Sequence, residues 1–402
     1  MTTTHKSFTD GTHRIVDPAV TLASVHPHLA AMGITRVANV TGLDRIGIPV
    51  VNAYRPNARA LSVSQGKGLT LDAAKASAVM EAVEGFHAEE IDLPYLTASA
   101  DQQAKTGRLI DTDRLPYLHG TTFNRDRVLH WIEGRDLVSG QSVWLPAELV
   151  HTDYTLPRQP NAGCFVASTN GLASGNHAFE AQVHGICEVI ERDAHTMWDH
   201  LPFRHKAATQ LDLGTVTEPQ CRRVIDALTA AGMAVGVWDM SGDVGVATFH
   251  CLITDTRDAD GHSGGGAGTH LCREVALMRA LTEAVQVRTN YITGARDDLH
   301  PTEYTPAGIA RKNRYAQELM EGPIAHAVPF GDIPTHRCET LEEDLDILLT
   351  RLQAVGVTEV VAVDLAKPAF GIAVQRIVIP GLEGPHDHDD YCPGDRALRV
   401  PR

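Results

Sequence analysis

One order of apolar and polar positions recurs three times along the chain. Apolar residues at helical spacing come first, a glycine follows, and a run rich in β-branched residues comes last. The glycine suits the end of a helix, where the backbone needs a positive φ, and the last run is typical of a buried strand. Each stretch therefore predicts a helix and a strand joined at Gly33, Gly232 or Gly356. The stretches are residues 29–41, 228–240 and 352–365.

In the first two stretches a second strand pattern follows, and then a long helix that carries glutamates. Glu81 lies 48 residues after Gly33, and Glu283 lies 51 residues after Gly232. This nearly equal spacing indicates an internal duplication. The alternative is that such units recur by chance, because they are common in α+β proteins. The pattern predicts an α+β fold of mixed β-sheets and packed helices, built from repeated helix-strand-strand-helix units.

Two segments lie outside these units. Residues 91–160 carry turn residues together with Trp131 and Trp144, and we expect an inserted set of strands and loops there. Residues 381–402 are rich in Gly, Pro and Asp, and we expect an irregular tail. With the repeated units, these segments predict a single composite domain over residues 1–402.

Polar residues repeat with one spacing on three of the predicted helices. Ser77, Glu81 and Glu84 are separated by four and then three residues. They lie within about 60° of one another, on one face of a helix. The same spacing on two further helices gives three matching polar rows. The other rows are His184, Glu188 and Glu191, with Glu180 and Arg192 beside them, and Arg279, Glu283 and Gln286.

A row of carboxylates on an otherwise apolar helix needs compensation. Like charges at this spacing repel by about 0.2–0.5 kcal/mol, and burying unpaired carboxylates costs far more. Mg²⁺ supplies the compensation, because it binds carboxylate oxygens together with the phosphates of a nucleotide. The alternative is that each row is a solvated face, where Glu is common for its helix propensity. Three matching rows beside apolar faces favour a site for metal and nucleotide.

A cation precedes the first of these helices. Gly66, Lys67 and Gly68 stand just before the predicted helix start, where backbone N–H groups and the helix dipole attract anions. The segment lacks the GxxxxGK[ST] sequence of a P-loop, so a phosphate site here is of another type. A plain turn is the alternative.

The overall charge argues against some classes of binding partner. A formal net charge of −15 argues against general binding to nucleic acid or an anionic membrane, because clustered Lys and Arg hold such phosphates. The seven cysteines form no CxxC pair, so neither a zinc ribbon nor a disulfide framework is predicted. The first residues lack the apolar segment of a signal peptide, and no stretch is long enough to span a membrane. We therefore expect a cytoplasmic protein.

In sequence order, four strings resemble the ATP-binding motifs of the YcaO family. They are GKG (66–68), KASAVMEAVEG (75–85), STNGLASGNHAFEAQVHGICEVIERDA (168–194) and ALMRALTEAVQVR (276–288). The resemblance runs in order over nearly the whole chain, from about residue 8 to residue 399. It implies a YcaO-type fold with a non-P-loop site for ATP and Mg²⁺.

The resemblance also implies a role for individual residues. Glutamates would hold Mg²⁺, and basic or polar residues would contact the phosphates. Gly85, His184 and Arg279 stand where some members carry Arg, Gln and Gln, which we interpret as variation among subgroups. The implied metal ligands are Glu81, Glu84, Glu180, Glu188, Glu191 and Glu283, and the implied ATP contacts are Lys67, Ser77, Arg192, Arg279, His184 and Arg14.

Members of this family phosphorylate an amide oxygen after, or together with, attack on the amide carbon by a nucleophile. Loss of phosphate then leaves an azoline, an amidine or a thioamide. Residues 6–22 and 35–68 resemble the stand-alone branch associated with TfuA proteins, which implies backbone thioamide formation with a sulfur donor. The chain ends in RVPR, whereas azoline-forming members often end in a PxPxP tail. The expected partners are a peptide or protein substrate, a TfuA-like protein that delivers sulfur, and a second copy in a homodimer.

Two other functions stay open. One is an azoline-forming cyclodehydratase, in which a Cys, Ser or Thr of a ribosomal peptide is the nucleophile. The other is a non-catalytic ATP-binding scaffold that presents a peptide to another enzyme. The retained carboxylates argue against the scaffold, since it needs no Mg²⁺ site.

No protein nucleophile or general base stands out from the sequence. His87 and His195 are candidate bases, but histidines on helices are more often structural or solvated. Cys164 is a candidate sulfur carrier, although a small buried thiol is the simpler interpretation. The HDHDD sequence at 386–390 is a candidate metal site, and a solvated acidic tail is the simpler interpretation there.

Overall fold

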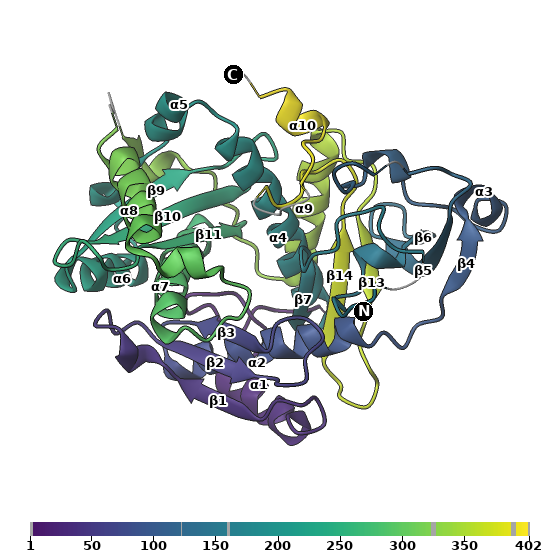
Figure 1. Ribbon diagram of the computed structural model, residues 1–402, viewed down its shortest axis with the longest axis horizontal. Helices are drawn as coiled ribbons and strands as arrows, with labels where there is room; N and C mark the ends of the chain where they lie inside the picture. The colour runs from purple at the N-terminus through teal and green to yellow at the C-terminus, as the bar shows by residue number, and fades with distance from the viewer. Residues whose placement is uncertain (1–2, 122, 159–160, 323–326, 387–390, 401–402) are drawn as a thin grey trace.

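Three β-sheets surround a central helix, α4, in a computed structural model of the chain (Figure 1). The predicted α+β class is confirmed. The structure describes residues 3–121, 123–158, 161–322, 327–386 and 391–400. The helices are α1 (Pro18–Val25), α2 (Leu71–Glu89), α3 (Ala100–Gln103), α4 (Ala178–Asp199), α5 (Phe203–Ala208), α6 (Pro219–Ala230), α7 (Arg273–Thr293), α8 (Pro306–Met320), α9 (Leu341–Ala354) and α10 (Asp395–Leu398).

The strands pair into three larger sheets and one small one. They are β1 (Arg36–Asn39), β2 (Val50–Tyr54), β3 (Val63–Lys67), β4 (Leu96–Ser99), β5 (Val128–Asp136), β6 (Ser142–Pro146), β7 (Leu172–Gly175), β8 (Leu211–Asp212), β9 (Met233–Asp239), β10 (Ala247–Asp255), β11 (Gly264–His270), β12 (Val328–Pro329), β13 (Val361–Asp364) and β14 (Ala373–Val378). The antiparallel orders are β1-β2-β3, β11-β10-β9 and β4-β5-β13-β14-β7, with β6 beside β5. Parallel β8 and β12 form the small sheet.

The first two predicted units form one repeated arrangement, but each has a strand that the sequence did not predict. β1, β2 and β3 lead into α2, and β9, β10 and β11 lead into α7. The additional strands are β3, which reads VSQGK, and β11, which reads GGGAGTH, and their glycines weaken the strand signal. The segment 66–68, which we considered as an anion-binding turn, is therefore the end of a strand and the residue after it.

The glycines of β3 and β11 allow a helix to pack directly on each strand. A Cβ atom at Gly66 would stand 2.1 Å from the carbonyl oxygen of Ala74 on α2. A Cβ atom at Gly268 would stand 2.1 Å from the carbonyl oxygen of Ala276 on α7. Each glycine precedes its alanine by eight residues, so the two units repeat the same close contact. The repeat predicted from spacing is present at the level of individual backbone contacts.

The three glycines that were expected to end helices all have a positive φ: 70° at Gly33, 77° at Gly232 and 85° at Gly356. α6 and α9 end close to Gly232 and Gly356 as predicted. The prediction is wrong in the first stretch, where α1 ends at Val25 and turns follow. Too few residues lie between Leu29 and Gly33 for a stable α-helix, because helix nucleation is costly.

The third unit is completed by segments that are distant in sequence. After α9, β13 and β14 pair antiparallel, and β14 then pairs with β7, which lies about 200 residues earlier in the chain (Arg376 opposite Leu172). α4 follows directly after β7. Each of the three larger sheets thus has an edge strand that leads into a helix with a polar row: β3 into α2, β11 into α7 and β7 into α4.

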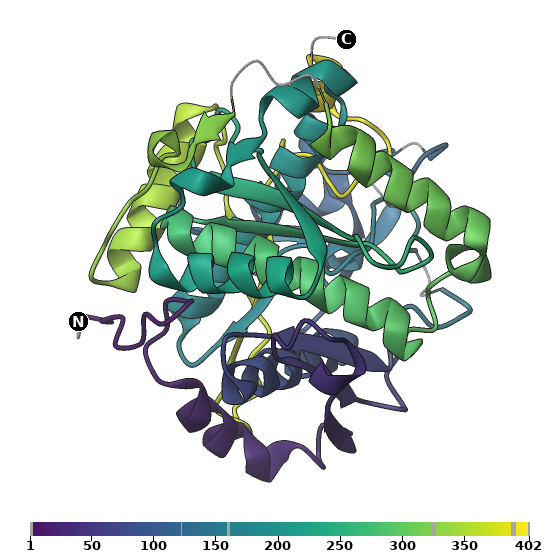
Figure 2. The same cartoon turned by 90° about the vertical axis from the view of Figure 1, so that its left-hand side faces the viewer.

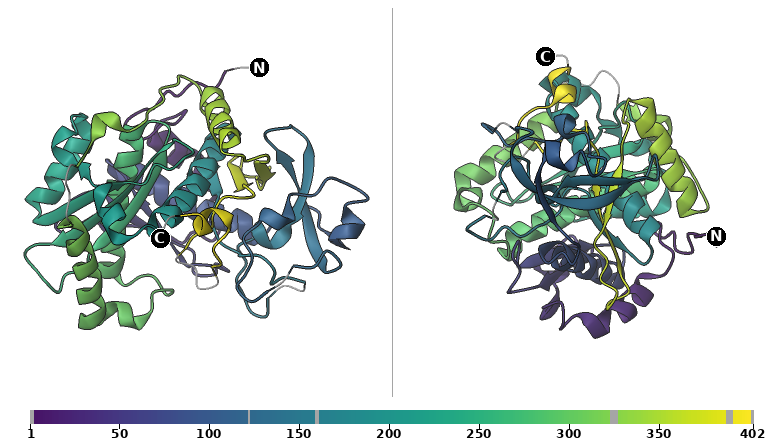
Figure 3. Two further views of the ribbon diagram at one scale, coloured as in Figure 1. Left: turned by 90° about the horizontal axis from the view of Figure 1, so that it is seen from above. Right: turned by 90° about the vertical axis from the view of Figure 1, so that its right-hand side faces the viewer.

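Residues 91–160 supply β4, β5 and β6, which lie at one end of the molecule (Figure 3). β5 pairs with β13, so these strands extend the largest sheet. Residues 381–386 and 391–400 are irregular apart from α10, and they are fixed onto α4. Arg396 Nε lies 2.8 Å from Asp193 Oδ1, and the Glu383 amide donates to the same oxygen at 2.8 Å.

Within the described residues, all seven cysteines are free thiols. Across the same part of the chain, no helix has both the length and the apolar character needed to cross a membrane.

Candidate functional site

The three helices with polar rows meet at the centre of the molecule. α2 packs on β3 and β7, α7 packs on β11 and β3, and α4 packs on β7, β14 and β11 (Figure 1). The charges of the rows are close enough to affect one another: Glu81 and Glu188 both raise the pKa of Glu84, and Glu283 raises that of Glu191. The structure therefore brings together five of the predicted carboxylates from three helices. They are Glu81, Glu84, Glu188, Glu191 and Glu283.

Two of these glutamates are held in equivalent ways in the two repeated units. The amide of Gln65 on β3 donates to Glu81 Oε2 at 3.4 Å, and the amide of Ala267 on β11 donates to Glu283 Oε1 at 3.4 Å. Both amides lie 16 residues before their glutamates. Lys67 then crosses between the units, with its Nζ 2.6 Å from Glu283 Oε2.

Desolvation by the surrounding protein shapes the charge of this cluster. It raises the pKa of Glu81 to about 7, of Glu84 to about 8 and of Glu188 to about 7. Glu81 is nevertheless exposed to solvent, so we place it at the solvent-facing side of the cluster. Glu283 differs, because Lys67 and then Arg192 overcome desolvation and hold its pKa below the usual value. Near neutral pH the cluster is therefore poised between protonated and ionised carboxylates.

Glu84 and Glu191 are positioned by different means. The amide and the hydroxyl of Ser174 on β7 both donate to Glu84 Oε1, at 2.8 and 2.7 Å. Glu191 is 8% exposed, and burial raises its pKa. Glu188 lies 3.9 Å from Arg192, one turn further along α4.

Glu180 lies at the edge of the cluster and already has protein partners. It is 1% exposed. The Ile15 amide donates to its Oε1 at 2.6 Å, and the Asn176 amide donates to its Oε2 at 2.7 Å. Both oxygens thus bind the backbone of this chain, and the role of Glu180 as a metal ligand stays a prediction.

Cations lie close enough to these carboxylates to lower their pKa values: the charge of Arg279 acts on Glu188 and on Glu191. Arg279 Nη2 donates to His184 Nδ1 at 2.6 Å; burial, and then Arg279, lower the pKa of His184 far below its usual value, so the imidazole is neutral and accepts. Burial lowers the pKa of Arg14, Glu180 opposes that effect, and Arg279 adds to it. Two guanidinium groups held close together fit an anionic ligand such as a triphosphate.

The remaining residues that were predicted to contact the nucleotide lie on α2 and α4. Ser77 is half-buried on α2, one turn before Glu81. Gln286 Nε2 donates to the Gln65 carbonyl at 3.3 Å, which ties α7 to β3. Arg192 is about one-third exposed on α4.

The donor set fits Mg²⁺ bound together with a nucleotide. Within the described residues, no group of three or more His, Cys, Asp or Glu side chains is arranged to hold a metal ion by itself. Mg²⁺ is usually bound through one or two carboxylates, with waters and substrate phosphates as its other ligands. The site has carboxylates with raised pKa values beside clustered cations. The carboxylates suit the metal ion, and the cations suit the phosphates that complete its ligands.

Some charged residues near the cluster had no signal in the sequence. The charge of Arg296 acts on Glu81, and the charge of Arg376 acts on Glu188. Arg296 follows Gly294, whose φ of 56° ends α7 in the left-handed region. Gly294 was a readable sign of the turn, but no pattern marked Arg296 or the strand residue Arg376, since neither belongs to a polar row.

The candidates for a general base and a sulfur carrier mostly lie in surroundings that are typical of structural residues. His87 is fully buried, and its Nδ1 lies 2.8 Å from the Val83 carbonyl oxygen. Cys164 is also fully buried, and burial raises its pKa, as expected of an inert thiol. His195 packs on His250 with ring centroids 4.8 Å apart. Of the HDHDD sequence, residues 387–390 lie outside the described residues.

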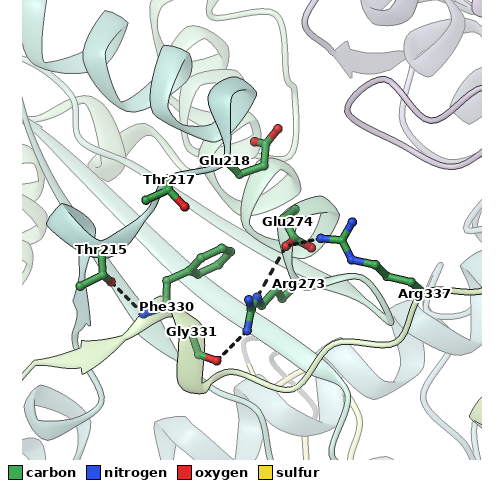
Figure 4. A pocket seen from close by; sticks show the side chains of 8 residues that line it. All are labelled: Thr215, Thr217, Glu218, Arg273, Glu274, Phe330, Gly331 and Arg337. Carbon is green, nitrogen blue, oxygen red and sulfur yellow. Dashed lines mark hydrogen bonds and ion pairs between the residues drawn. The ribbon is translucent and has the colours of Figure 1, made fainter.

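A separate cavity of about 350 Å³ lies at the N-terminal end of α7 (Figure 4). Arg273 Nη1 donates to the Gly331 carbonyl at 2.8 Å, and Arg337 pairs with Glu274 at 2.8 Å. Glu274 precedes Glu283 by nine residues, which places them on opposite faces of α7 and about 13 Å apart along its axis. The cavity is therefore distinct from the carboxylate cluster.

Comparison with known proteins identifies the family. A family model described as YcaO cyclodehydratase, ATP- and Mg²⁺-binding, matches residues 65–383. An uncharacterized protein of the tfuA 3′ region in Rhizobium leguminosarum bv. trifolii is 37% identical, over 92% of this chain and 88% of its own length. An uncharacterized protein of Methanothermobacter thermautotrophicus is 35% identical, over 92% of this chain and 94% of its own length.

Solved structures agree on the fold. YcaO from Methanopyrus kandleri bound with AMPPCP and Mg²⁺ has a TM-score of 0.75 at 22% identity, covering 97% of this chain and 100% of its own. A heterocyclase in complex with substrate and cofactor has a TM-score of 0.79 at 20% identity; 96% of this chain matches, and the chain spans 54% of that longer protein. The expected cofactors, ATP and Mg²⁺, are those of the matching family model. The chain therefore belongs to the YcaO family.

Proposed function

We propose that this protein uses ATP and Mg²⁺ to phosphorylate a backbone amide oxygen of a peptide or protein, and that the product is a thioamide. The observation that carries the proposal is the meeting of carboxylates from α2, α4 and α7 with a set of cations, in a chain of an ATP- and Mg²⁺-binding family. Neither feature alone defines the reaction. Together they supply both halves of a metal-triphosphate site.

Each set of residues has a distinct task in this proposal. The carboxylates Glu81, Glu84, Glu188, Glu191 and Glu283 would hold Mg²⁺, with Glu180 as a further ligand. Lys67, Arg14, Arg192 and Arg279, with Ser77 and His184, would contact the nucleotide. Bound Mg²⁺ neutralises charge that develops on the transferred phosphoryl group. Lys67 has a second task, because it holds Glu283 ionised and so ready to bind a metal.

Phosphorylation solves a leaving-group problem. A nucleophile that attacks the amide carbon leaves a carbon-oxygen bond that must break, and phosphate leaves far more readily than oxide or hydroxide. The cations around the site stabilise the negative charge on the phosphoryl oxygens during transfer, and they act strongly because they are largely removed from water.

The thioamide product rests on one relative and on the resemblance of residues 6–22 and 35–68 to one branch of the family. The relative from Rhizobium leguminosarum lies in the tfuA 3′ region, and the first residues resemble the TfuA-associated branch. We therefore propose a TfuA-like protein as the partner that delivers sulfur. A homodimer and a cytoplasmic location remain predictions.

The azoline-forming alternative has support of its own. The family model carries the description cyclodehydratase, and a heterocyclase shares the fold. The scaffold alternative has less support, because five carboxylates with mutually perturbed pKa values have no purpose in a protein that only presents a peptide.

Mass spectrometry of candidate peptides separates these functions. The protein is incubated with peptide, ATP, Mg²⁺ and sulfide, with and without the TfuA-like partner. Exchange of oxygen for sulfur adds about 16 Da to the peptide, whereas azoline formation removes one water, or about 18 Da. Both changes follow from atomic masses once the phosphorylated amide has lost phosphate. A gain that requires ATP supports thioamidation, and a loss that needs no sulfide supports cyclisation. Nucleotide binding without any change in peptide mass, across peptides encoded near the gene, would favour the scaffold.

A further inference from the structure

The N-terminal segment crosses the molecule before it enters the first sheet. We call residues 4–17 the N-terminal strap. It begins beside α9, where the Thr4 amide donates to Glu342 Oε1 at 3.0 Å and the Leu341 amide donates to the Thr4 carbonyl at 3.0 Å. Figure 2 shows this segment at the edge of the molecule, close to α9. The strap lies outside residues 65–383, which match the family model.

A buried ion pair fastens the start of the strap. Lys6 Nζ lies 3.0 and 2.9 Å from the two carboxylate oxygens of Asp344 on α9. Their side chains are only 3% and 2% exposed. Removing one partner of such a pair leaves the other charge without compensation, so the pair strongly favours the docked strap. We call this pair the clasp.

The far end of the strap is fixed at the carboxylate cluster. Phe8 and Arg14 exchange backbone hydrogen bonds of 2.9 and 2.8 Å, which close a turn that contains Gly11 at a φ of 73°. The next amide, that of Ile15, donates to Glu180 Oε1 at 2.6 Å. Arg14 therefore stands between two fixed backbone points.

The side chain of Arg14 has little else to hold it. Its Nη1 donates to the neighbouring His13 carbonyl at 3.3 Å. Among the described residues, no carboxylate lies within ion-pair distance of its guanidinium, although the charges of Glu180 and Glu84 reach it. A half-buried guanidinium beside Arg279, without its own counter-ion, is arranged to receive an external anion.

We propose that the Lys6–Asp344 clasp fixes the strap and so sets the position of Arg14, which the proposed function already assigns to the phosphates. Lys6 and Asp344 are positioning residues that act through Arg14. This inference rests on the nucleotide site of the proposed function, but not on which product is formed. It implies that nucleotide binding and docking of the strap reinforce each other, because each favours the same arrangement of Arg14.

Binding of Mg²⁺ and AMPPCP, measured by calorimetry, tests the proposal. The variants are Arg14→Met, Lys6→Met, Asp344→Asn and the double change Lys6→Met with Arg14→Met. Lys105→Met, at an exposed lysine far along the chain, is the control. If loss of the clasp leaves the strap docked in one-tenth of the molecules, the contribution of Arg14 weakens by about tenfold. We therefore expect Lys6→Met and Asp344→Asn to weaken nucleotide binding by about tenfold, towards the affinity of Arg14→Met.

The double variant separates positioning from general destabilisation. If Lys6 acts through Arg14, the double variant binds as weakly as Arg14→Met alone, because the two effects are not additive. Equal weakening by Lys6→Met with and without Arg14 would overturn the proposal. Unchanged affinity in Lys6→Met and Asp344→Asn would overturn it as well.

Two further measurements guard against misfolding and against failure of the nucleotide site itself. Burial raises the pKa of Asp344 and Lys6 opposes this, so Asp344 can take up a proton when Lys6 is removed and the variant should fold. Reversal of the pair, Lys6→Asp with Asp344→Lys, should restore affinity. A variant whose fold is damaged is recognised by its shifted unfolding temperature. The wild-type protein is the reference for the proposed function. If it binds no Mg²⁺-AMPPCP, the proposal of a nucleotide site fails. If only the proposed role of the clasp fails, the wild-type protein still binds.

Discussion

Lys67 at the end of β3 and Glu283 on α7 join the two repeated units through one ion pair, with Nζ 2.6 Å from Oε2. Each residue comes from a different copy of the repeat, so neither copy contains the pair alone. The pair also explains why Glu283 differs from its equivalent, Glu81: Lys67 lowers the pKa of Glu283 below the usual value, while that of Glu81 rises to about 7.

Lys67→Ala should mainly weaken the binding of ATP. The change removes a cation from the proposed phosphate site and leaves the carboxylates in place. We expect KM for ATP to rise by about tenfold or more, with a smaller loss in kcat, as for an interaction made largely in the ground state. Steady-state ADP release measures both constants, and Lys105→Ala is the matched control. A loss confined to kcat would contradict a binding role.

Glu191→Gln should abolish most activity without unfolding the protein. The substitution keeps the size of the side chain and its hydrogen bonds but removes a charge that would bind Mg²⁺. We expect ADP release to fall by about 100-fold or more, and the unfolding temperature of the metal-free protein to stay the same or rise, because a buried carboxylate is lost. Glu318→Gln, at an exposed position on α8, is the control. A folded Glu191→Gln protein that consumes ATP at the wild-type rate would exclude the metal role.

Gly268→Ala should strongly destabilise the fold. Its Cβ would stand 2.1 Å from the Ala276 carbonyl oxygen, so α7 must move away from β11. We expect a loss of about 3 kcal/mol in the free energy of unfolding, or no folded protein, as for overpacking against backbone. Gly42→Ala is the control, because no atom lies within 4 Å of its added Cβ. Denaturant unfolding compares the two, and equal stability would show that the close contact is not required.

Without Mg²⁺, the protein should become less stable between pH 6.5 and 8.5. Burial raises the pKa values of Glu84 and Glu188 to about 8 and 7, well above the usual value of a glutamate. In this range the folded state binds more protons than the unfolded state, so the free energy of unfolding falls as pH rises. Buried histidines with lowered pKa values have their opposite effect below this range. Thermal unfolding across this pH range tests the trend, which Glu84→Gln should reduce.

Addition of Mg²⁺ and nucleotide should reverse that dependence. Binding requires ionised carboxylates, so the complex releases protons and its affinity rises with pH over the same range. Calorimetry in two buffers of different ionisation enthalpy measures the number of protons released at pH 7. Binding without proton release would show that these glutamates are not the ligands.

The sequence by itself determined which helices carry the polar rows. The four-then-three spacing of Glu81, Glu84, Glu188, Glu191 and Glu283 is a property of a single helix, and helical periodicity is local. The glycine positions were readable for the same reason: Gly232 and Gly356 end helices with a positive φ, as local backbone geometry demands.

Only the tertiary structure decided how these helices meet. β3 and β11 had only a weak strand signal, because their glycines serve contacts with helices that follow later in the chain. The third sheet joins β7 to β14 across about 200 residues, a pairing that no local pattern encodes. The pKa values of the glutamates likewise depend on neighbours from other helices, and the Lys6–Asp344 clasp joins residues 338 positions apart. Helical periodicity specifies which face of a helix is polar. Burial and the pairing of segments distant in sequence decide what these polar faces enclose.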